Sequence, residues 1–243
     1  MKYKTIGILG GMGPEATAEL YFRIIRIFQN EYWAKFDDDF PEMILLNLPI
    51  PDVVENLKEE KKVEKMLVNG VKKLENAGAD FIAIPCNTVT FFLSAMQESV
   101  SIPILSILKE TADEIERLGV KKVGVVGTEI TINKNMYGQV LKDVELIIPE
   151  VQSQKVTTRI IMNILAGKKN KEDQIFLQDL IYKLKIDGAE KVILGCTELP
   201  LLVKGNQDTV DTIEVLAKAT VREAIKIARE NLNKQQRTSE VKL

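Results

Sequence analysis

Short apolar runs alternate with longer amphipathic stretches along most of the chain. The short runs are rich in β-branched residues and have the length of buried strands. We predict seven strands, over Thr5–Leu9, Met43–Leu46, Phe81–Ile84, Ile104–Ile107, Lys122–Val126, Glu145–Ile148 and Lys191–Leu194. Because strands that alternate with helices usually pair in parallel, the pattern predicts an α/β fold made of doubly wound parallel sheets.

The longer stretches carry apolar residues at the spacing of one helix face. In the first of them, Leu20, Ile24 and Ile27 recur every three or four positions after Pro14, which an opening helical turn tolerates. We predict helices over Pro14–Asn30, Val53–Ala77, Val89–Glu98, Leu108–Leu118, Lys134–Val140, Ser153–Ala166, Glu172–Lys185 and Thr209–Asn233. The polar tail from Lys234 to Leu243 is expected to fray.

One phrase occurs twice. Gly78–Thr88 and Gly188–Glu198 each begin with Gly-Ala-acid, continue as an apolar run and reach a cysteine eight residues after the glycine. The repeat predicts two similar α/β domains, 1–105 and 106–208, with one thiol at the same place in each and both thiols facing one cleft. The last helix, in 209–243, is expected to pack back on the first domain, although it could equally complete the second.

Composition narrows the chemistry that these domains can carry. The 243 residues have a net charge of -2, which shows no basic surface for nucleic acid or an anionic membrane. No apolar run is long enough to span a bilayer, and we expect a cytoplasmic protein. The chain has no histidine, so the commonest general base and metal ligand is missing, and its two cysteines do not form a disulfide framework. A metal site is therefore not expected.

Both cysteines are candidates for catalysis. Cys86 and Cys196 follow predicted strands, and ligands of doubly wound folds bind beyond the carboxyl ends of the strands. Each also precedes a predicted helix N-terminus, which is expected to lower the thiol pKa below its usual value of about 8.5. A single free cysteine is more often a small buried hydrophobe. The aligned pair, beside residues that cap helices, favours the catalytic interpretation.

Two other motifs are weaker. The glycine-rich turn Gly7–Pro14 could bring backbone N–H groups close to a small ligand, but it lacks the glycine order of a dinucleotide or phosphate loop. Gly127 and Thr128 occupy the matching place in the second half. The acidic run Asp37–Asp39 is interpreted as a solvated loop.

Four segments carry a family resemblance. They are Gly10–Thr17, Asn47 with Pro49–Asp52, Pro85–Thr88, and Gly195–Leu202, and together they resemble the aspartate/glutamate racemase superfamily, most closely its aspartate racemase branch. The resemblance implies two domains related by a pseudo-twofold axis, with an amino-acid substrate in the cleft between them. It also implies that neither pyridoxal phosphate nor metal is needed, and that the protein is a homodimer.

The resemblance further implies a two-base mechanism. One of Cys86 and Cys196, as thiolate, would remove the α-proton while the other, as thiol, returns a proton to the opposite face. The residues implied in substrate binding, through the α-carboxylate, the ammonium group or the cleft lining, are Met12, Asp52, Asn87, Thr88, Thr128, Thr197 and Glu198.

Three departures from the family pattern bear on the substrate. Thr90, Val53 and Leu165 stand where many relatives carry histidine, arginine and lysine. Aspartate or glutamate is the default substrate, but a distal carboxylate would lack two expected cations, which leaves another acidic or a less polar amino acid open. Other chemistries of the superfamily, those of a hydantoin racemase, maleate isomerase or decarboxylase, also stay open. So does a bilobed protein that only binds a small acid.

Overall fold

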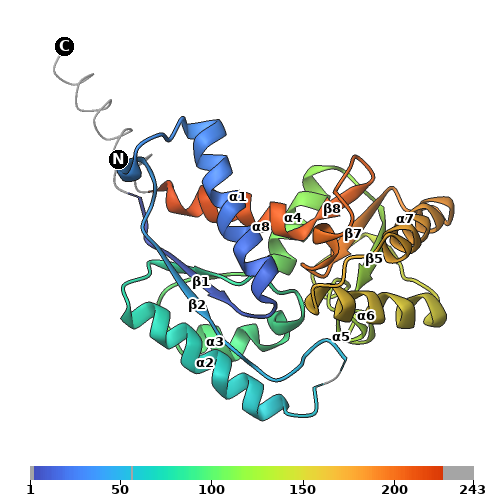
Figure 1. Cartoon of the computed structure of the whole chain (residues 1–243), viewed down its shortest axis with the longest axis horizontal. Helices are drawn as coiled ribbons and strands as arrows, with labels where there is room; N and C mark the ends of the chain where they lie inside the picture. The colour runs from blue at the N-terminus through green and yellow to red at the C-terminus, as the bar shows by residue number, and fades with distance from the viewer. Residues whose placement is uncertain (1–2, 56, 227–243) are drawn as a thin grey trace.

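Two parallel sheets form the centre of the protein. The computed structural model describes residues 3–55 and 57–226, and within them each half of the chain contributes one four-stranded sheet. Helices pack on both sheets, and the two halves lie side by side (Figure 1). The predicted α/β class with two similar parallel-sheet halves is confirmed.

The two sheets have the same strand order. In the first, the strands are β1 (Ile6–Gly10), β2 (Met43–Asn47), β3 (Phe81–Ala83) and β4 (Ile104–Leu105), in the order β2-β1-β3-β4. In the second, they are β5 (Lys122–Gly127), β6 (Glu145–Ile147), β7 (Lys191–Gly195) and β8 (Thr209–Asp211), in the order β6-β5-β7-β8. Since β3 and β7 hold equivalent positions, the residues that follow them reach equivalent edges of the two sheets.

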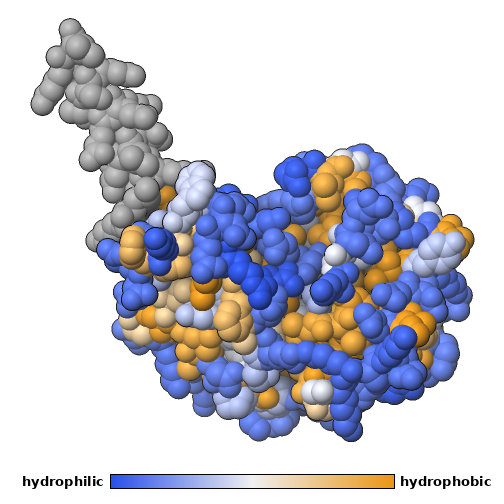
Figure 2. Space-filling model, turned by 45° about the horizontal axis from the view of Figure 1, so that its top comes forward, coloured by the Kyte–Doolittle hydropathy of each residue, from blue (hydrophilic) through white to orange (hydrophobic). Residues whose placement is uncertain are grey.

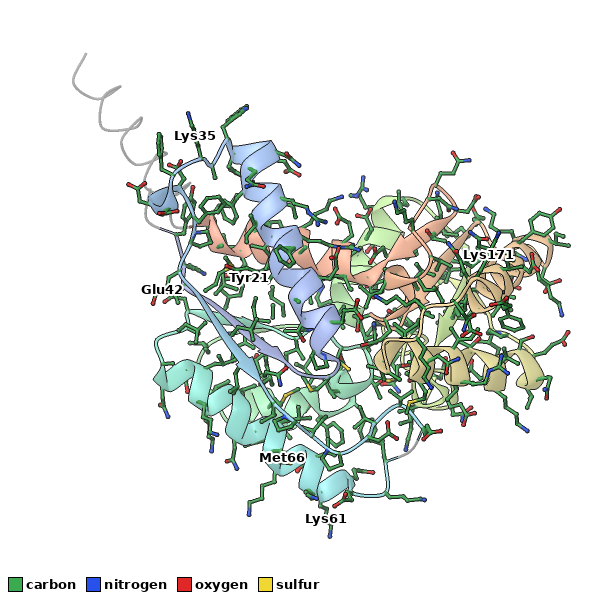
Figure 3. The ribbon with its side chains drawn as sticks, viewed as in Figure 1. Tyr21, Lys35, Glu42, Lys61, Met66 and Lys171 are labelled. Carbon is green, nitrogen blue, oxygen red and sulfur yellow. The ribbon has the colours of Figure 1, made fainter. Side chains whose placement is uncertain are left out.

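The helices place their apolar faces against the sheets. Figure 3 shows this on α2, where the side chain of Lys61 points into solvent. Met66, five residues further along the helix, packs against the apolar core of the first half. Among the described residues, none of the helices combines the length and the apolar character needed to cross a bilayer. The helices are α1 (Pro14–Tyr32), α2 (Glu60–Asn76), α3 (Leu93–Glu98), α4 (Ile107–Arg117), α5 (Glu129–Asn133), α6 (Val151–Leu165), α7 (Lys171–Ile186) and α8 (Thr212–Ala224), with 3-10 turns at Asp37–Asp39, Thr88–Phe92 and Leu199–Leu201.

The strand β8 was not predicted. The sequence pattern placed residues 209–211 at the start of the last helix, whereas they pair in parallel with β7, Val210 opposite Ile193. The helix begins only at Thr212, because the side chain of Asp211 accepts hydrogen bonds from the backbone N–H groups of Ile213 and Glu214. The local pattern missed the strand because its stability comes from a neighbour distant in sequence.

Four other predictions differ from the structure. The helix predicted from Val53 starts at Glu60, since the carboxylate of Asp52 holds a turn by accepting backbone N–H bonds from the two residues after Val53. The helix predicted over Lys134–Val140 is a series of turns, in which Asn135 is left-handed at φ 47°. The predicted strand ending at Ile107 stops at Leu105, because Ser106 caps α4, and the segment from Val89 begins as a 3-10 turn.

Helix α8 packs against α1 and α4 in one buried cluster that reaches both sheets. Leu20 of α1, Ile115 of α4 and Leu216 of α8 belong to it, together with Ile8 and Val125 of the central strands. The proposed domain limits and the helix's assignment to the first domain stay predictions, and the expected continuation to Asn233 and the tail 234–243 lie outside the described residues.

The shared cluster makes a stability prediction. Leu216 is fully buried, so Leu216→Ala should lower the free energy of unfolding by about 2–5 kcal/mol, measured by urea titration. Leu118→Ala, at a leucine that is 40% exposed, should change it by no more than about 0.5 kcal/mol. Equal effects of the two substitutions would show that α8 does not carry the core between the sheets.

Candidate active site

The two cysteines lie at equivalent strand ends. Cys196 directly follows β7, and Cys86 comes three residues after β3. Both are free thiols and both are buried, at 6% and 5% exposure for Cys86 and Cys196. The two turns touch, since the hydroxyl of Thr197 donates a hydrogen bond of 3.1 Å to the carbonyl of Pro85. The structure therefore brings both cysteine turns to one place between the halves, where α1 also begins (Figure 1).

Glu198 supplies the charged group of this site. Its Oε2 accepts the thiol proton of Cys196 at 3.0 Å and a weaker bond from the Thr197 hydroxyl at 3.2 Å. Its Oε1 accepts the backbone N–H of Gly13, from the first half, at 3.0 Å. The carboxylate is buried, and this burial raises its pKa. Glu198 was predicted to bind substrate, yet its described contacts all go to protein groups.

The prediction of lowered thiol pKa values is wrong for this arrangement. Burial, and then the negative charge of Glu198, raise the pKa of Cys86 to about 12. The backbone N–H groups of Thr88 and Val89 act in the predicted direction but are outweighed. Burial, the charge of Glu198 and the hydrogen bond to it also raise the pKa of Cys196 well above its ordinary value. Both cysteines are therefore thiols at neutral pH.

Threonine hydroxyls join the halves beside Cys86. Thr88, in the turn after Cys86, lies 3.0 Å from Thr128, measured between their Oγ1 atoms. Thr128 caps α5 by accepting the backbone N–H of Thr131, and its hydroxyl also lies 3.0 Å from that of Thr131. All three threonines are buried. The predicted residues Thr88 and Thr128 thus meet directly, although they are 40 residues apart.

Asn87 is held by two residues that the sequence did not single out. The hydroxyl of Tyr137 donates to Asn87 Oδ1 at 2.7 Å, and Asn87 Nδ2 donates to the hydroxyl of Thr212 at 3.2 Å. Thr212 in turn donates to the carbonyl of Leu194 in β7, at 3.0 Å. No local pattern marks Tyr137 or Thr212, because both partners are distant in sequence. The side-chain oxygen of Asn87 and one of its amide hydrogens are therefore already hydrogen-bonded within the protein.

The remaining predicted residues are placed less centrally. Met12 is partly buried and packs against the apolar cluster of the first half, which includes Cys86. Asp52 is exposed, and its carboxylate bonds to the backbone of its own turn. The structure therefore gives Asp52 a local structural role and no described contact with either cysteine.

The three positions that depart from the family pattern are not cationic. The hydroxyl of Thr90 donates back to the carbonyl of Cys86 at 3.3 Å, and Val53 is buried in the same apolar cluster as Cys86. Leu165 lies beside Gly13, where an added Cβ would be 2.5 Å from a Leu165 methyl and 3.0 Å from Glu198 Oε1. Leu165 is therefore close to the Glu198 side of the site.

An open groove lies away from the cysteines. It has a volume of about 1260 Å³ and is lined by α1, α4, α8 and the loop before β8, without either cysteine. Ion pairs fill its walls, such as Arg23 with Asp211 at 2.6 Å and Arg222 with Glu110 at 2.5 Å. The face turned to the viewer in Figure 2 is accordingly mostly hydrophilic. Within the described ranges, no three acidic or thiol side chains gather as metal ligands would.

Comparisons with known proteins agree with this geometry. The family model described as Asp/Glu/hydantoin racemase matches residues 9–224. The broad specificity amino-acid racemase RacX of Bacillus subtilis is 33% identical, over 89% of this chain and 96% of the relative. The crystal structure of an aspartate racemase homologue from Pyrococcus horikoshii has a TM-score of 0.74 at 33% identity, covering 90% of this chain and 98% of the other. The Picrophilus torridus aspartate racemase has a TM-score of 0.78 at 26% identity, covering 90% and 93%.

The effect of the Glu198 charge on the pKa values of the two thiols can be tested by substitution. Glu198→Gln removes a negative charge that raises both thiol pKa values, so both should fall and each thiolate should form at lower pH. The rate of alkylation by iodoacetamide, followed for each cysteine by peptide mass spectrometry across pH, should rise at lower pH than in the unchanged protein. Glu172→Gln, on the exposed start of α7, is the control and should leave both profiles alone. An unchanged or upward shift in Glu198→Gln would contradict the assignment.

Proposed function

This chain belongs to the Asp/Glu/hydantoin racemase family, and we propose that it is a cofactor-independent amino-acid racemase with Cys86 and Cys196 as its two bases. The observation that carries the proposal is the contact between the two turns that follow equivalent strands, each of which carries a buried thiol. A substrate between them would present opposite faces of its α-carbon to the two sulfur atoms. This is the geometry that inversion by proton exchange requires.

Glu198 starts the reaction in this proposal. The Cys196 thiol gives its proton to Glu198 Oε2, to which it is already hydrogen-bonded, and becomes a thiolate. The thiolate removes the α-proton, and the Cys86 thiol donates its proton to the opposite face. The Cys86 thiolate that results faces the backbone N–H groups of Thr88 and Val89, which favour its negative charge. After the product leaves, Cys86 takes up a proton from water and Glu198 releases one to water, which restores the starting state. The reverse reaction passes through the same proton transfers in the opposite order.

The threonine cluster is suited to the α-carboxylate. The hydroxyls of Thr88 and Thr128 converge from the two halves, next to the turn that carries Cys86. Each hydroxyl has one proton, which it can donate either to the other hydroxyl or to a carboxylate. A substrate carboxylate placed there could accept from both hydroxyls and would then bind both halves together. Negative charge that develops on the carboxylate during proton removal would be stabilised by the same donors.

The residues at the positions that depart from the family pattern favour a substrate with an uncharged side chain. Val53 and Leu165 are apolar, and the buried carboxylate of Glu198 lies near Leu165 and would repel a second carboxylate. The relative from Bacillus subtilis is named a broad specificity racemase. We infer that this protein accepts amino acids with apolar side chains at least as well as aspartate or glutamate.

The first test is isotope exchange in heavy water without added cofactor. Deuterium should enter the α-carbon of L- and D-amino acids with inversion, and Cys86→Ser and Cys196→Ser should each lower the rate at least about a hundredfold, because a hydroxyl is a far weaker acid than a thiol. Circular dichroism should show both variants folded.

Two outcomes would contradict the proposal. Full racemisation by either serine variant would remove that cysteine from the mechanism. No exchange with any amino acid, combined with ligand affinity that both variants keep, would indicate a binding protein instead.

The substrate class is tested by Leu165→Lys. A cation beside Glu198 should raise kcat/KM for aspartate relative to alanine by about tenfold, since it pairs with the distal carboxylate. Leu118→Lys, at a similarly exposed leucine that directly follows α4, is the matched control and should leave the ratio unchanged. A preference for aspartate in the unchanged protein, or no change in Leu165→Lys, would overturn the inference.

A further inference from the structure

Tyr137 touches both cysteine turns. Its hydroxyl donates to the side chain of Asn87, the residue after Cys86, at 2.7 Å. The other contact is at Gly195, the residue before Cys196, where an added Cβ would lie 3.1 Å from Tyr137 Cε2. The ring is 2% exposed, so it is enclosed between these neighbours. One rigid side chain therefore spans the distance from one turn to the other.

The backbone around Tyr137 is fixed by its own contacts. The backbone N–H of Met136 donates to the carbonyl of Thr131 at 3.1 Å, and that of Leu141 to the carbonyl of Tyr137 at 2.8 Å. Met136 and Leu141 are buried in the cluster that joins the sheets. A tyrosine has only two side-chain torsions, so a fixed backbone and an enclosed ring leave its hydroxyl little freedom.

The contacts of Tyr137 close a ring through the protein. From its hydroxyl they pass to Asn87, from Asn87 to Thr212, and from Thr212 to the carbonyl of Leu194 in β7. Leu194 is joined to Gly195, against which the tyrosine ring packs. The Cys86 turn is thus tied to the Cys196 strand by a direct contact and by a hydrogen-bonded path, and both include the same residue.

We propose that Tyr137 is a positioning residue that sets the separation of the two catalytic thiols. The proposal rests on the proposed two-cysteine function. Proton transfer at the α-carbon requires each sulfur atom to lie close to the substrate at the same time, and a misplacement of about 1 Å can cost about a hundredfold in rate. Tyr137 does not itself exchange protons, because burial holds the pKa of its phenol far above the ordinary value.

The matched substitution is Tyr137→Phe, which keeps the ring against Gly195 and removes only the hydroxyl. Asn87 Oδ1 then loses its donor in a buried place, and the Cys86 turn is no longer tied at that point. We expect kcat to fall about tenfold to a hundredfold while KM changes by less than about threefold. Tyr182→Phe, on an exposed tyrosine of α7, should leave both constants unchanged.

Isotope exchange separates positioning from a general loss of structure. When both thiols are in place, deuterium enters with inversion. When one is displaced, the thiol that removes the proton also returns deuterium to the same face, so exchange without inversion should rise relative to racemisation in Tyr137→Phe. The added methyl group of Gly195→Ala would press on the ring of Tyr137, so this variant should also show more exchange without inversion. In both variants the pH profile of kcat should keep its acidic and its basic limb.

Three other results would contradict the positioning role of Tyr137. If the unchanged protein racemises through both cysteines and Tyr137→Phe keeps its kcat and its ratio of exchange to inversion, the positioning role is wrong and the proposed function stands. Loss of one limb of the pH profile in Tyr137→Phe would instead make Tyr137 an acid or base. Absence of racemisation in the unchanged protein would overturn both proposals.

Discussion

The buried carboxylate of Glu198 is the constraint on which the rest of the site depends. It accepts hydrogen bonds from Gly13 in the first half and from Cys196 and Thr197 in the second, so its solvation requires the two halves to be together. Since a buried charge is costly without partners, closure of the halves and stabilisation of Glu198 support each other. Burial, and then this charge, raise the pKa of both cysteines, and the carboxylate accepts the hydrogen bond of the Cys196 thiol.

The duplicated fold does not make the two thiols equivalent. Cys86 and Cys196 follow strands of the same rank in sheets of the same order, and the turns that carry them touch. Their support differs, because the backbone N–H groups of Thr88 and Val89 act on Cys86, whereas Cys196 has one such backbone N–H group and is itself hydrogen-bonded to the Glu198 carboxylate. At the position that Glu198 occupies in the second copy of the repeat, the first copy has Thr88. The duplication therefore gives the two thiols equivalent positions, and this difference between the copies gives them different surroundings.

Local patterns predicted the elements whose stability is local. Seven of the eight predicted helices appear with one or both ends shifted, and the cysteine repeat correctly indicated two similar parallel-sheet halves. The failures have a common cause. The strand β8 forms through pairing with β7, and the segment 134–140 follows buried contacts with the sheets rather than its helical pattern. The thiol pKa values depended on burial, which a motif at a helix start does not reveal.

The sequence by itself determined the alternation of strands and helices and the doubling of the fold, and it singled out two cysteines as candidate reactive groups. These are properties of residue type and spacing along the chain. Only the tertiary structure decided that Glu198 accepts the Cys196 proton beside Gly13, that Thr88 meets Thr128, and that Tyr137 lies between the two turns. Those contacts join residues that are 40 to 185 positions apart, and their geometry is set by how the two halves pack.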